Sequence, residues 1–354
     1  QLDETPQLFP VLLGLALFSL VRGRLPSARA LAEQCLGVAE RARDPMLLSA
    51  SYELMGSILF HQGEFLLARS HLERALASYD PRQHYVYMLL YGHDPGVFGA
   101  FYLAWGLWYL GYPEQAISKT ENALALARQL GSPYILSAAL NMTITVRESC
   151  LETAVVPILL QENQQLCREH GFSLQASIAA LQQTWLLTHQ GRLEEGIPLM
   201  RQSLATWQAM GDALMAPYHL GLLAKAYGKA GQTEEGLSVL AEALDGVGET
   251  GERFYEAELY RLKGALTLQS KVPSPRSKVE AEAEGCFLKA IEIARRQQAK
   301  SLELRAVMSL SRLWRQQGKK RQARRMLAEI YGWFTEGFDT KDLKEAKTLL
   351  EKLS

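Results

Sequence analysis

The segment 91–109 contains the densest group of residues whose chemistry suits ligand recognition. Tyrosine and tryptophan combine a large contact area with a polar handle, so a dense aromatic stretch can line a recognition groove. The alternative is that aromatic side chains at helical spacing pack against neighbouring helices, and both can hold when two faces of one helix differ. The binding candidates in this segment are Tyr91, His93, Asp94, Tyr102, Trp105 and Trp108.

A second dense stretch, 251–264, mixes charged and aromatic residues. On a helix, Phe254, Glu258 and Arg261 would fall along one side, and Glu258 can pair with Arg261 at i, i+3. Regularly spaced charges usually mark a solvated face, so a recognition role and a salt-bridge role between neighbouring elements both remain open. The candidates here are Tyr255, Glu258 and Arg261, and Tyr218 and His219 complete the predicted binding set.

No motif in the sequence supports catalysis. The phosphate-binding Gly-x4-Gly-Lys-Ser/Thr loop, the His-Glu-x-x-His zinc motif and the Gly-x-Ser-x-Gly nucleophile elbow do not occur. The seven histidines are scattered without the i, i+4 spacing of a helical metal site, and His84 and His93 lack a third ligand. We therefore expect no enzymatic activity, no catalytic residue, no metal and no cofactor.

The elements that must position these residues follow a helical repeat. A glycine followed five residues later by alanine or glycine occurs at Gly23/Ala28, Gly63/Ala68, Gly111/Ala116, Gly191/Gly196, Gly231/Gly236 and Gly318/Ala323. The steps between these glycines are 40, 48, 80, 40 and 87 residues, or one or two periods of forty plus at most eight. The glycine is expected to end a first helix in the left-handed conformation, and the small residue lets a second helix pack closely against it.

An Ala-x3-large-x2-Ala pattern at 68–75, 116–123 and 283–290 resembles the tetratricopeptide (TPR) repeat, with a longer period that implies longer helices. The resemblance implies an all-α fold: a right-handed superhelical solenoid of about eight helix-turn-helix repeats with a C-terminal capping helix at 340–353. We expect one domain over 1–354, stabilised by stacking of each repeat on its neighbours. The predicted repeats are 8–44, 45–80, 96–132, 133–171, 172–211, 212–251, 252–299 and 300–337.

Three places depart from the period. The fourth unit has Leu151 and Val156 at the expected glycine and alanine positions and β-branched residues in its first helix, so we expect irregular geometry there. An aromatic insertion covers roughly 80–98 and ends in Asp94-Pro95, a good helix start. A polar, proline-containing insertion at 270–278 is typical of a solvated loop.

The amino-acid composition argues against some classes of partner but does not identify one. The 354 residues are 48% apolar and carry 38 basic and 38 acidic side chains, so no global charge recruits nucleic acid or an anionic membrane. The run 8–21 is too short to span a bilayer and contains Pro10. Four cysteines lie in apolar helical stretches, which indicates unpaired core residues of a reducing, cytoplasmic protein.

A basic segment at 295–325 holds eleven lysines and arginines and one acid, Glu303. It lacks the interleaved aromatic residues of a nucleic-acid surface apart from Trp314. We interpret it as a solvated face or a docking surface for an acidic sister domain, and we expect no nucleic-acid partner.

Several motifs together resemble one family. They are YGHDPG at 91–96, LWYLGYP at 107–113, LLAKAYGKAG at 222–231, the stretch 251–264, AKSLELRA at 299–306 and YGWFTEGFDT at 331–340. They are similar to the C-terminal TPR region of bacterial signalling proteins in which a class III adenylate/guanylate cyclase domain precedes a STAND-type, AAA-like ATPase. The resemblance implies that this catalytic chemistry lies upstream, and with a first residue of Gln1 we expect a piece of a longer polypeptide.

The predicted function is a non-catalytic sensor and protein-interaction module that regulates the upstream ATPase or cyclase. Its expected partner is a protein segment, or a sister domain of the same polypeptide, held in the concave groove. Two alternatives stay open: a small-molecule receptor similar to the repeat domain of MalT-like transcription activators, and a spacer that holds oligomers together.

Overall fold

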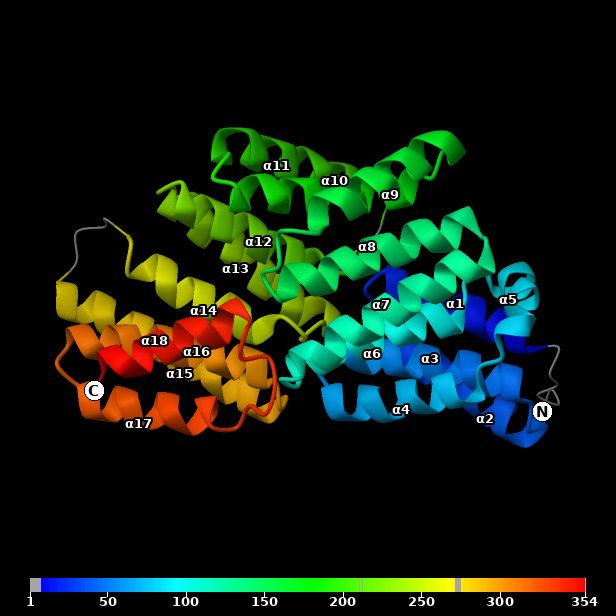
Figure 1. Cartoon of the computed structure of the whole chain (residues 1–354), viewed down its shortest axis with the longest axis horizontal. Helices are drawn as coiled ribbons and strands as arrows, with labels where there is room; N and C mark the ends of the chain where they lie inside the picture. Colours follow the sequence, from blue (N-terminus) through cyan, green and yellow to red (C-terminus); the bar gives the residue numbers. More distant parts are fainter. Residues whose placement is uncertain (1–7, 210, 212, 271–274, 354) are drawn as a thin grey trace.

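The computed structural model describes residues 8–209, 211, 213–270 and 275–353 of the chain. Within these ranges the secondary structure is helical, with no β-strand (Figure 1). Sixteen of the described α-helices form eight consecutive pairs, and a final helix follows the last pair. The predicted all-α, right-handed TPR-like solenoid of about eight repeats with a C-terminal capping helix is thereby confirmed.

The two helices of each pair are joined by a tight turn in most repeats. The pairs are α1 (Phe9–Val21) and α2 (Leu25–Ala42), α3 (Pro45–His61) and α4 (Phe65–Ser78), α6 (Pro95–Tyr109) and α7 (Pro113–Leu130), α8 (Pro133–Ser149) and α9 (Val156–His170), α10 (Ser173–His189) and α11 (Leu193–Ala209), α12 (Ala216–Lys229) and α13 (Thr233–Thr250), α14 (Glu256–Thr267) and α15 (Arg276–Arg296), and α16 (Lys300–Gln316) and α17 (Lys320–Tyr331), followed by the cap α18 (Lys341–Lys352). We number these pairs repeats one to eight.

The glycines of the repeat take the predicted left-handed conformation. The angle φ is 67° at Gly23, 78° at Gly63, 94° at Gly111, 81° at Gly191, 74° at Gly231 and 79° at Gly318. The small residue five positions later is buried in each case because two helix backbones approach there. A Cβ added to Gly236, for example, would lie 3.2 Å from the carbonyl oxygen of Ala224 on the partner helix.

The fourth repeat is more regular than its sequence suggests. Helix α8 is continuous through the β-branched residues 143–146, and α9 begins at Val156, which is fully buried. Leu151 replaces the glycine and still adopts the left-handed conformation, with φ 59°. The expected irregular geometry is therefore wrong for the helices, and the departure is confined to a longer link, 150–155, because stacking on repeats three and five holds both helices in place.

Leu151→Gly tests whether this conformation is strained. A left-handed residue with a Cβ costs roughly 1–2 kcal/mol of backbone strain, which the substitution by glycine removes. The larger conformational entropy of glycine in the unfolded state offsets part of this stabilisation. We expect the variant to raise the free energy of unfolding by about 1 kcal/mol in urea titrations. Gly131→Leu, at φ 68° with no atom within 4 Å of an added Cβ, should lower it by a similar amount. A loss of stability in Leu151→Gly would show that the leucine side chain contributes more than the strain costs.

The aromatic insertion forms a short 3₁₀ turn, η2 (Pro81–Gln83), and helix α5 (His84–Tyr91), which lies beside α1 of repeat one. Asp94 caps α6 by accepting a hydrogen bond from the amide of Val97 at 2.9 Å, and Pro95 is its first residue, as predicted. Of the second insertion, 270–278, residues 271–274 lie outside the described residues.

Hydrogen bonds also join repeats that lie five units apart, which one-dimensional stacking does not predict. They run from Ala213 N to Val21 O (3.0 Å), from Arg253 N to His61 O (2.8 Å) and from Ser301 Oγ to Trp108 O (2.5 Å). The ends of the first helices of repeats one, two and three thus contact the starts of repeats six, seven and eight. One superhelical turn takes about five repeats, and the two halves of the chain meet near the centre of Figure 1. We call this contact the closure seam.

An aromatic cluster lies at the middle of the closure seam. Phe60, Trp105 and Phe254 come from repeats two, three and seven, and their ring centroids lie 4.8–5.3 Å apart. All three are fully buried. Phe254 precedes α14, which begins at Glu256, so its predicted place on one helix face with Glu258 and Arg261 is wrong.

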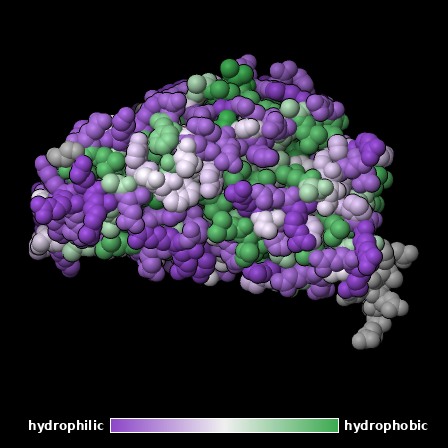
Figure 2. All heavy atoms as spheres, turned by 60° about the horizontal axis from the view of Figure 1, so that its bottom comes forward, coloured by the Kyte–Doolittle hydropathy of each residue, from purple (hydrophilic) through white to green (hydrophobic). Residues whose placement is uncertain are grey.

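The remaining surface and thiol features are unremarkable for a helical repeat. The four described cysteines are unpaired. Cys35, Cys150 and Cys167 are buried, as expected for core residues, whereas Cys286 is only half-buried. No described helix has both the length and the apolar character needed to cross a bilayer. The face in Figure 2 is mainly hydrophilic, with smaller apolar areas between the polar ones.

Candidate functional site

A cavity of about 220 Å³ lies on the inner wall of the solenoid, between the first helices of repeats three to six. Its apolar lining comes from all four helices, α6, α8, α10 and α12, and we call it the concave pocket. The lining residues used below are Phe98, Tyr102, Ala138, Asn141, Met142, Thr145, Glu148, Gln175, Ile178, Gln182, Trp207, Tyr218, His219 and Leu222.

A ladder of side-chain amides crosses one wall of the concave pocket. Asn141 Nδ2 donates to Gln175 Oε1 at 2.8 Å, and its Oδ1 accepts from Asn163 Nδ2 at 2.6 Å. Gln182 Nε2 donates to the Asn141 carbonyl oxygen at 2.7 Å and to Thr145 Oγ1 at 3.2 Å. Since a carbonyl can only accept, the Gln182 amide orientation is fixed and its Oε1 is turned away from the ladder.

Four buried polar atoms of the pocket residues have no hydrogen-bond partner within the described chain. They are Glu148 Oε1, Gln182 Oε1, Trp207 Nε1 and His219 Nδ1. Their side chains belong to residues that are only 4–6% exposed. An unpaired buried polar atom costs about 1–3 kcal/mol. Four of the ten such atoms found in the described residues belong to this one cavity, which makes it a candidate site.

Burial dominates the electrostatics of the pocket. It raises the pKa of Glu148 well above the ordinary carboxyl value, and the hydrogen bond from Tyr218 Oη to Glu148 Oε2, at 3.4 Å, only partly opposes this. Burial also raises the pKa of Tyr218. It lowers the pKa of His219 to about 4, so the imidazole is neutral near pH 7.

The lowered pKa of His219 makes stability depend on pH. The unfolded state, with an ordinary pKa of 6.5, binds more protons than the folded state between pH 6.5 and 4, so stability falls as the pH falls. From pH 7 to pH 5 the contribution of this one residue is about 2 kcal/mol. In urea titrations at pH 7, 6 and 5, the free energy of unfolding of His219→Gln should fall by about 2 kcal/mol less than that of the wild type between pH 7 and pH 5. An identical pH profile in both proteins would contradict the assignment.

Three of the predicted binding residues line the concave pocket: Tyr102, Tyr218 and His219. Tyr102 also contacts His61 Nε2 through its hydroxyl at 3.2 Å. The other predicted residues lie elsewhere, in the contacts described next.

The residues of the 91–94 motif make packing and capping contacts. Tyr91 packs edge-on against Phe9, at 5.8 Å between centroids. His93 Nε2 lies 3.0 Å from Glu53 Oε2; burial lowers the pKa of His93, but the contact with Glu53 raises it above its ordinary value. Asp94 accepts hydrogen bonds from Tyr79 Oη and His84 Nδ1 at 2.8 and 2.7 Å, in addition to capping α6.

The two tryptophans of α6 lie in the interior. Trp105 is fully buried and donates from Nε1 to Ser149 Oγ at 2.9 Å. Trp108 is 3% exposed, and the Arg305 guanidinium lies over its ring at 4.8 Å. Neither side chain presents a surface to a ligand in this conformation, so we leave both out of the proposed contact set.

The 255–261 residues form a second group on the inner wall, further along the solenoid. Tyr255 packs against Tyr218 at 4.9 Å, and Arg261 holds Glu258 through two contacts of 2.7 Å, which confirms the predicted i, i+3 pair. Arg261 also donates to Ser309 Oγ of repeat eight at 3.3 Å. The pair therefore acts at least as a bridge between neighbouring repeats.

Sequence reasoning missed the polar residues of the pocket, and the forty-residue period leads to one of them, Gln182. Two sets of lining residues recur at intervals of 40: Phe98, Ala138, Ile178 and Tyr218, and Tyr102, Met142, Gln182 and Leu222. Each set occupies one equivalent position on the first helices of repeats three to six. Two periods after Tyr102 lies Gln182. Two periods before Tyr218 lies Ala138, which is three residues before Asn141 on the same helix.

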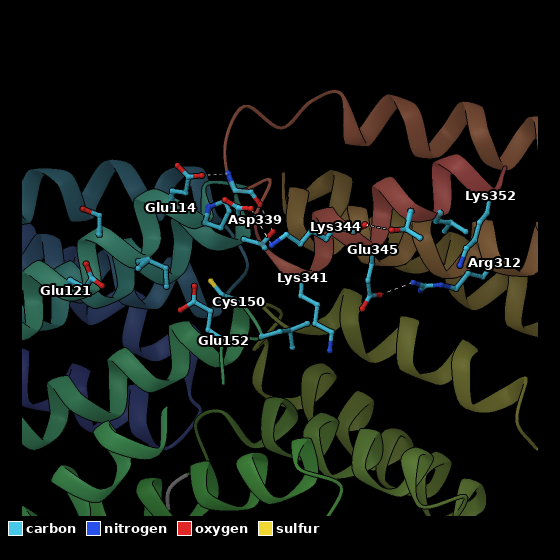
Figure 3. A pocket seen from close by; sticks show the side chains of 18 of the residues that line it. Glu114, Glu121, Cys150, Glu152, Arg312, Asp339, Lys341, Lys344, Glu345 and Lys352 are labelled. Atoms are coloured by element: carbon cyan, nitrogen blue, oxygen red, sulfur yellow. Dashed lines mark hydrogen bonds and ion pairs between the residues drawn. The ribbon is translucent and has the colours of Figure 1, made fainter. Parts of the chain in front are cut away.

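A larger, open cleft of about 970 Å³ lies between α7, the 150–152 link, α16 and the cap α18 (Figure 3). Carboxylates such as Glu114 and Glu121 line one side and basic residues such as Arg312 and Lys344 the other. Several are already paired, for example Arg312 with Glu345 at 3.0 Å. None of the unpartnered buried atoms found in the described chain belongs to a residue of this cleft. The concave pocket is therefore the stronger candidate site.

The basic segment 295–325 is partly neutralised by ion pairs. Arg295 and Lys300 both contact Glu303, at 2.6 and 2.9 Å, and Arg305 contacts Asp342 at 2.7 Å. Within the described ranges, no cluster of three or more His, Cys, Asp or Glu side chains has the geometry of a metal site.

Comparison with known proteins places the fold and leaves the function open. No protein-family model matches the chain. An uncharacterised curated protein of Rhizobium meliloti (strain 1021) is 22% identical over 320 residues, which are 88% of this chain and 30% of the relative. The chain thus spans less than a third of the curated relative that it matches.

Two solved Rap-type structures share the fold of this chain, and a third helical-repeat structure is less similar. The Rap conjugation gene regulator of plasmid pLS20, in complex with a Phr peptide, has a TM-score of 0.60 and 10% identity over 98% of this chain and 95% of that one. A Rap protein complexed with Competence and Sporulation Factor has a TM-score of 0.51 and 15% identity, over 86% and 74%. A STAND protein with a TPR sensor from Pyrococcus horikoshii has a TM-score of 0.47 and 14% identity, over 92% and 49%.

Proposed function

We propose that this chain is a non-catalytic sensor module whose concave pocket binds a short peptide or an extended protein segment. The observation that carries the proposal is the group of four unpartnered buried polar atoms around one apolar cavity on the inner wall. Buried polar groups of this kind supply orientation and specificity in binding sites, while the apolar lining supplies affinity. The pLS20 regulator, which has the same fold, is in complex with a peptide.

The size of the pocket favours an inserted side chain over a whole ligand. Its volume of about 220 Å³ is below the roughly 300 Å³ at which small-molecule sites usually begin. A peptide that follows the inner wall would place one side chain in the pocket and its backbone along the first helices.

The same residues offer a route from binding to regulation. Tyr218 lines the pocket and also packs against Trp105 and Phe254 of the closure seam, at 5.8 and 6.0 Å between centroids. In our proposal, a ligand that contacts Tyr218 binds the closed solenoid and a form with an opened seam with different affinities, which is the requirement for a conformational signal. In our proposal this signal reaches an ATPase or cyclase domain of the same cytoplasmic polypeptide.

Selection from a random hexapeptide pool on the immobilised protein tests the binding function. Ile178→Trp fills the pocket from a half-buried position, and Leu67→Trp adds the same bulk on the outer face of α4, where Leu67 is 51% exposed. We expect enriched peptides on the wild type and on Leu67→Trp, with enrichment lost on Ile178→Trp. Equal enrichment on all three proteins would place binding outside the pocket.

The regulatory context has a separate test. The complete open reading frame should encode a cyclase or phosphate-binding-loop ATPase domain before the first residue of this chain. A reading frame with neither domain would overturn the proposed link to nucleotide chemistry and leave the binding function standing.

A small-molecule sensor is the second candidate, because the pocket is partly enclosed rather than a wide, open groove. Thermal-shift screening with a metabolite library discriminates the two. A stabilising metabolite whose effect disappears in Ile178→Trp, with no peptide enriched on the wild type, would favour it.

A further inference from the structure

Within the described part of the chain, Glu148 forms no ion pair with a basic side chain. It lies in the last turn of α8, where the partial negative charge of the helix terminus disfavours an anion. Its neighbour Arg147 contacts Glu121 and Glu152 instead, at 2.8 and 2.5 Å. The hydrogen bond to Glu148 within the described chain comes from Tyr218 and engages Oε2, which leaves Oε1 without a donor.

A second acceptor lies close to Glu148 on the same wall. Gln182 is held against Thr145, one helical turn before Glu148, and its Oε1 can only accept a hydrogen bond. The two unpartnered oxygens on this wall are complemented by a ligand group with several N–H donors. A positive charge on that group favours the ionised form of Glu148, which burial alone disfavours. The surrounding lining, including Phe98, Ile178 and Leu222, is apolar and suits an aliphatic stem.

Resting on the proposed peptide-binding function, we infer that the concave pocket takes the side chain of a lysine or arginine, with Glu148 as its counter-ion and Gln182 as a second acceptor. An ammonium or guanidinium group supplies the missing donors, and its alkyl stem fills the apolar part. The cation also compensates the burial of Glu148, which raises the pKa of its carboxyl group. A buried carboxylate without a partner destabilises the protein. A cationic ligand pairs with it and a neutral ligand does not, so the site selects cationic ligands.

The test compares hexapeptide selection on the wild type, on Glu148→Gln and on Glu162→Gln. Glu162 is a surface carboxylate on α9 that pairs with Arg128 outside the pocket. We expect Lys or Arg to be enriched at one peptide position at least tenfold on the wild type and on Glu162→Gln, with the preference lost on Glu148→Gln. Glutamine keeps the shape of Glu148 without its charge, and circular dichroism with thermal melts checks that each variant is folded.

The same selection separates failure of this inference from failure of the binding function. Enriched peptides without Lys or Arg would overturn the inference that the pocket takes a cationic side chain, while peptide binding would stand. A Lys or Arg preference that persists on Glu148→Gln would likewise overturn the role of Glu148 as counter-ion and leave peptide binding intact. If no peptide is enriched, n-hexylamine serves as the probe. A thermal shift with the wild type that is absent in Glu148→Gln would keep the cation site and reject the peptide as its source, and no shift would overturn both.

Discussion

Phe254→Ala should remove about 3–5 kcal/mol of stability, the largest effect of any single change considered in this protein. Phe254 is fully buried, and its ring centroid lies 5.2–6.0 Å from those of Phe60, Trp105, Tyr109 and Tyr218. These partners come from repeats two, three and six, so the truncation opens a cavity where two halves of the solenoid meet. The seam, and the neighbouring pocket wall, should loosen before the outer repeats unfold.

Urea unfolding and amide hydrogen exchange measure these two effects. Exchange should accelerate in residues 58–64 and 252–256, where the His61 carbonyl binds the amides of Arg253 and Phe254. Phe18→Ala is the matched control, since Phe18 is 53% exposed on α1 and should cost less than about 1 kcal/mol. A loss of under 1 kcal/mol in Phe254→Ala would mean that the repeats stack without a cooperative seam.

Gly111→Ala should cost about 2–5 kcal/mol, because it combines a left-handed backbone with a clash across the seam. At Gly111, φ is 94°, and an added Cβ would lie 2.5 Å from Trp333 Cζ3 and 2.9 Å from Lys300 Cβ. Both neighbours belong to repeat eight, five repeats away. The alanine therefore pushes the turn of repeat three off the start of that repeat.

Gly191→Ala separates the two contributions. Gly191 is the equivalent glycine of repeat five, with φ 81° and no atom within 4 Å of an added Cβ. We expect it to cost only the backbone strain of about 1–2 kcal/mol in the same urea titrations. If Gly111→Ala is no worse than Gly191→Ala, repeats three and eight do not press on each other in solution.

The seam couples repeats that do not stack directly on one another. In an open solenoid each repeat contacts only its neighbours, and a local change fades along the array. Here Glu252 of repeat seven accepts hydrogen bonds from His61 of repeat two, at 2.9 Å, and from the Met215 amide of repeat six. Tyr218 connects the concave pocket to this network, because it lines the pocket and packs against Phe254, two residues after Glu252.

Much of the fold could be predicted from local chemistry. Glycine at Gly63 or Gly231 specifies a left-handed helix end, Asp94-Pro95 specifies a helix start, and small residues at fixed spacing specify close helix pairs. The candidate site was only partly predictable. Tyr102, Tyr218 and His219 were found because aromatic and histidine side chains stand out, whereas Glu148 and Gln182 resemble ordinary polar residues of a helix.

The sequence alone determined the period, the helix ends and the packing within each repeat, because these depend on residues fewer than about forty positions apart. The tertiary structure decided what the aromatic and charged residues do. The number of repeats in one superhelical turn results from small rotations summed over five units, which no local pattern reports. That sum buries Trp105 in the seam and places its ring beside Tyr218 of repeat six at the concave pocket. Glu148 lies at the same pocket and forms no ion pair among the described residues.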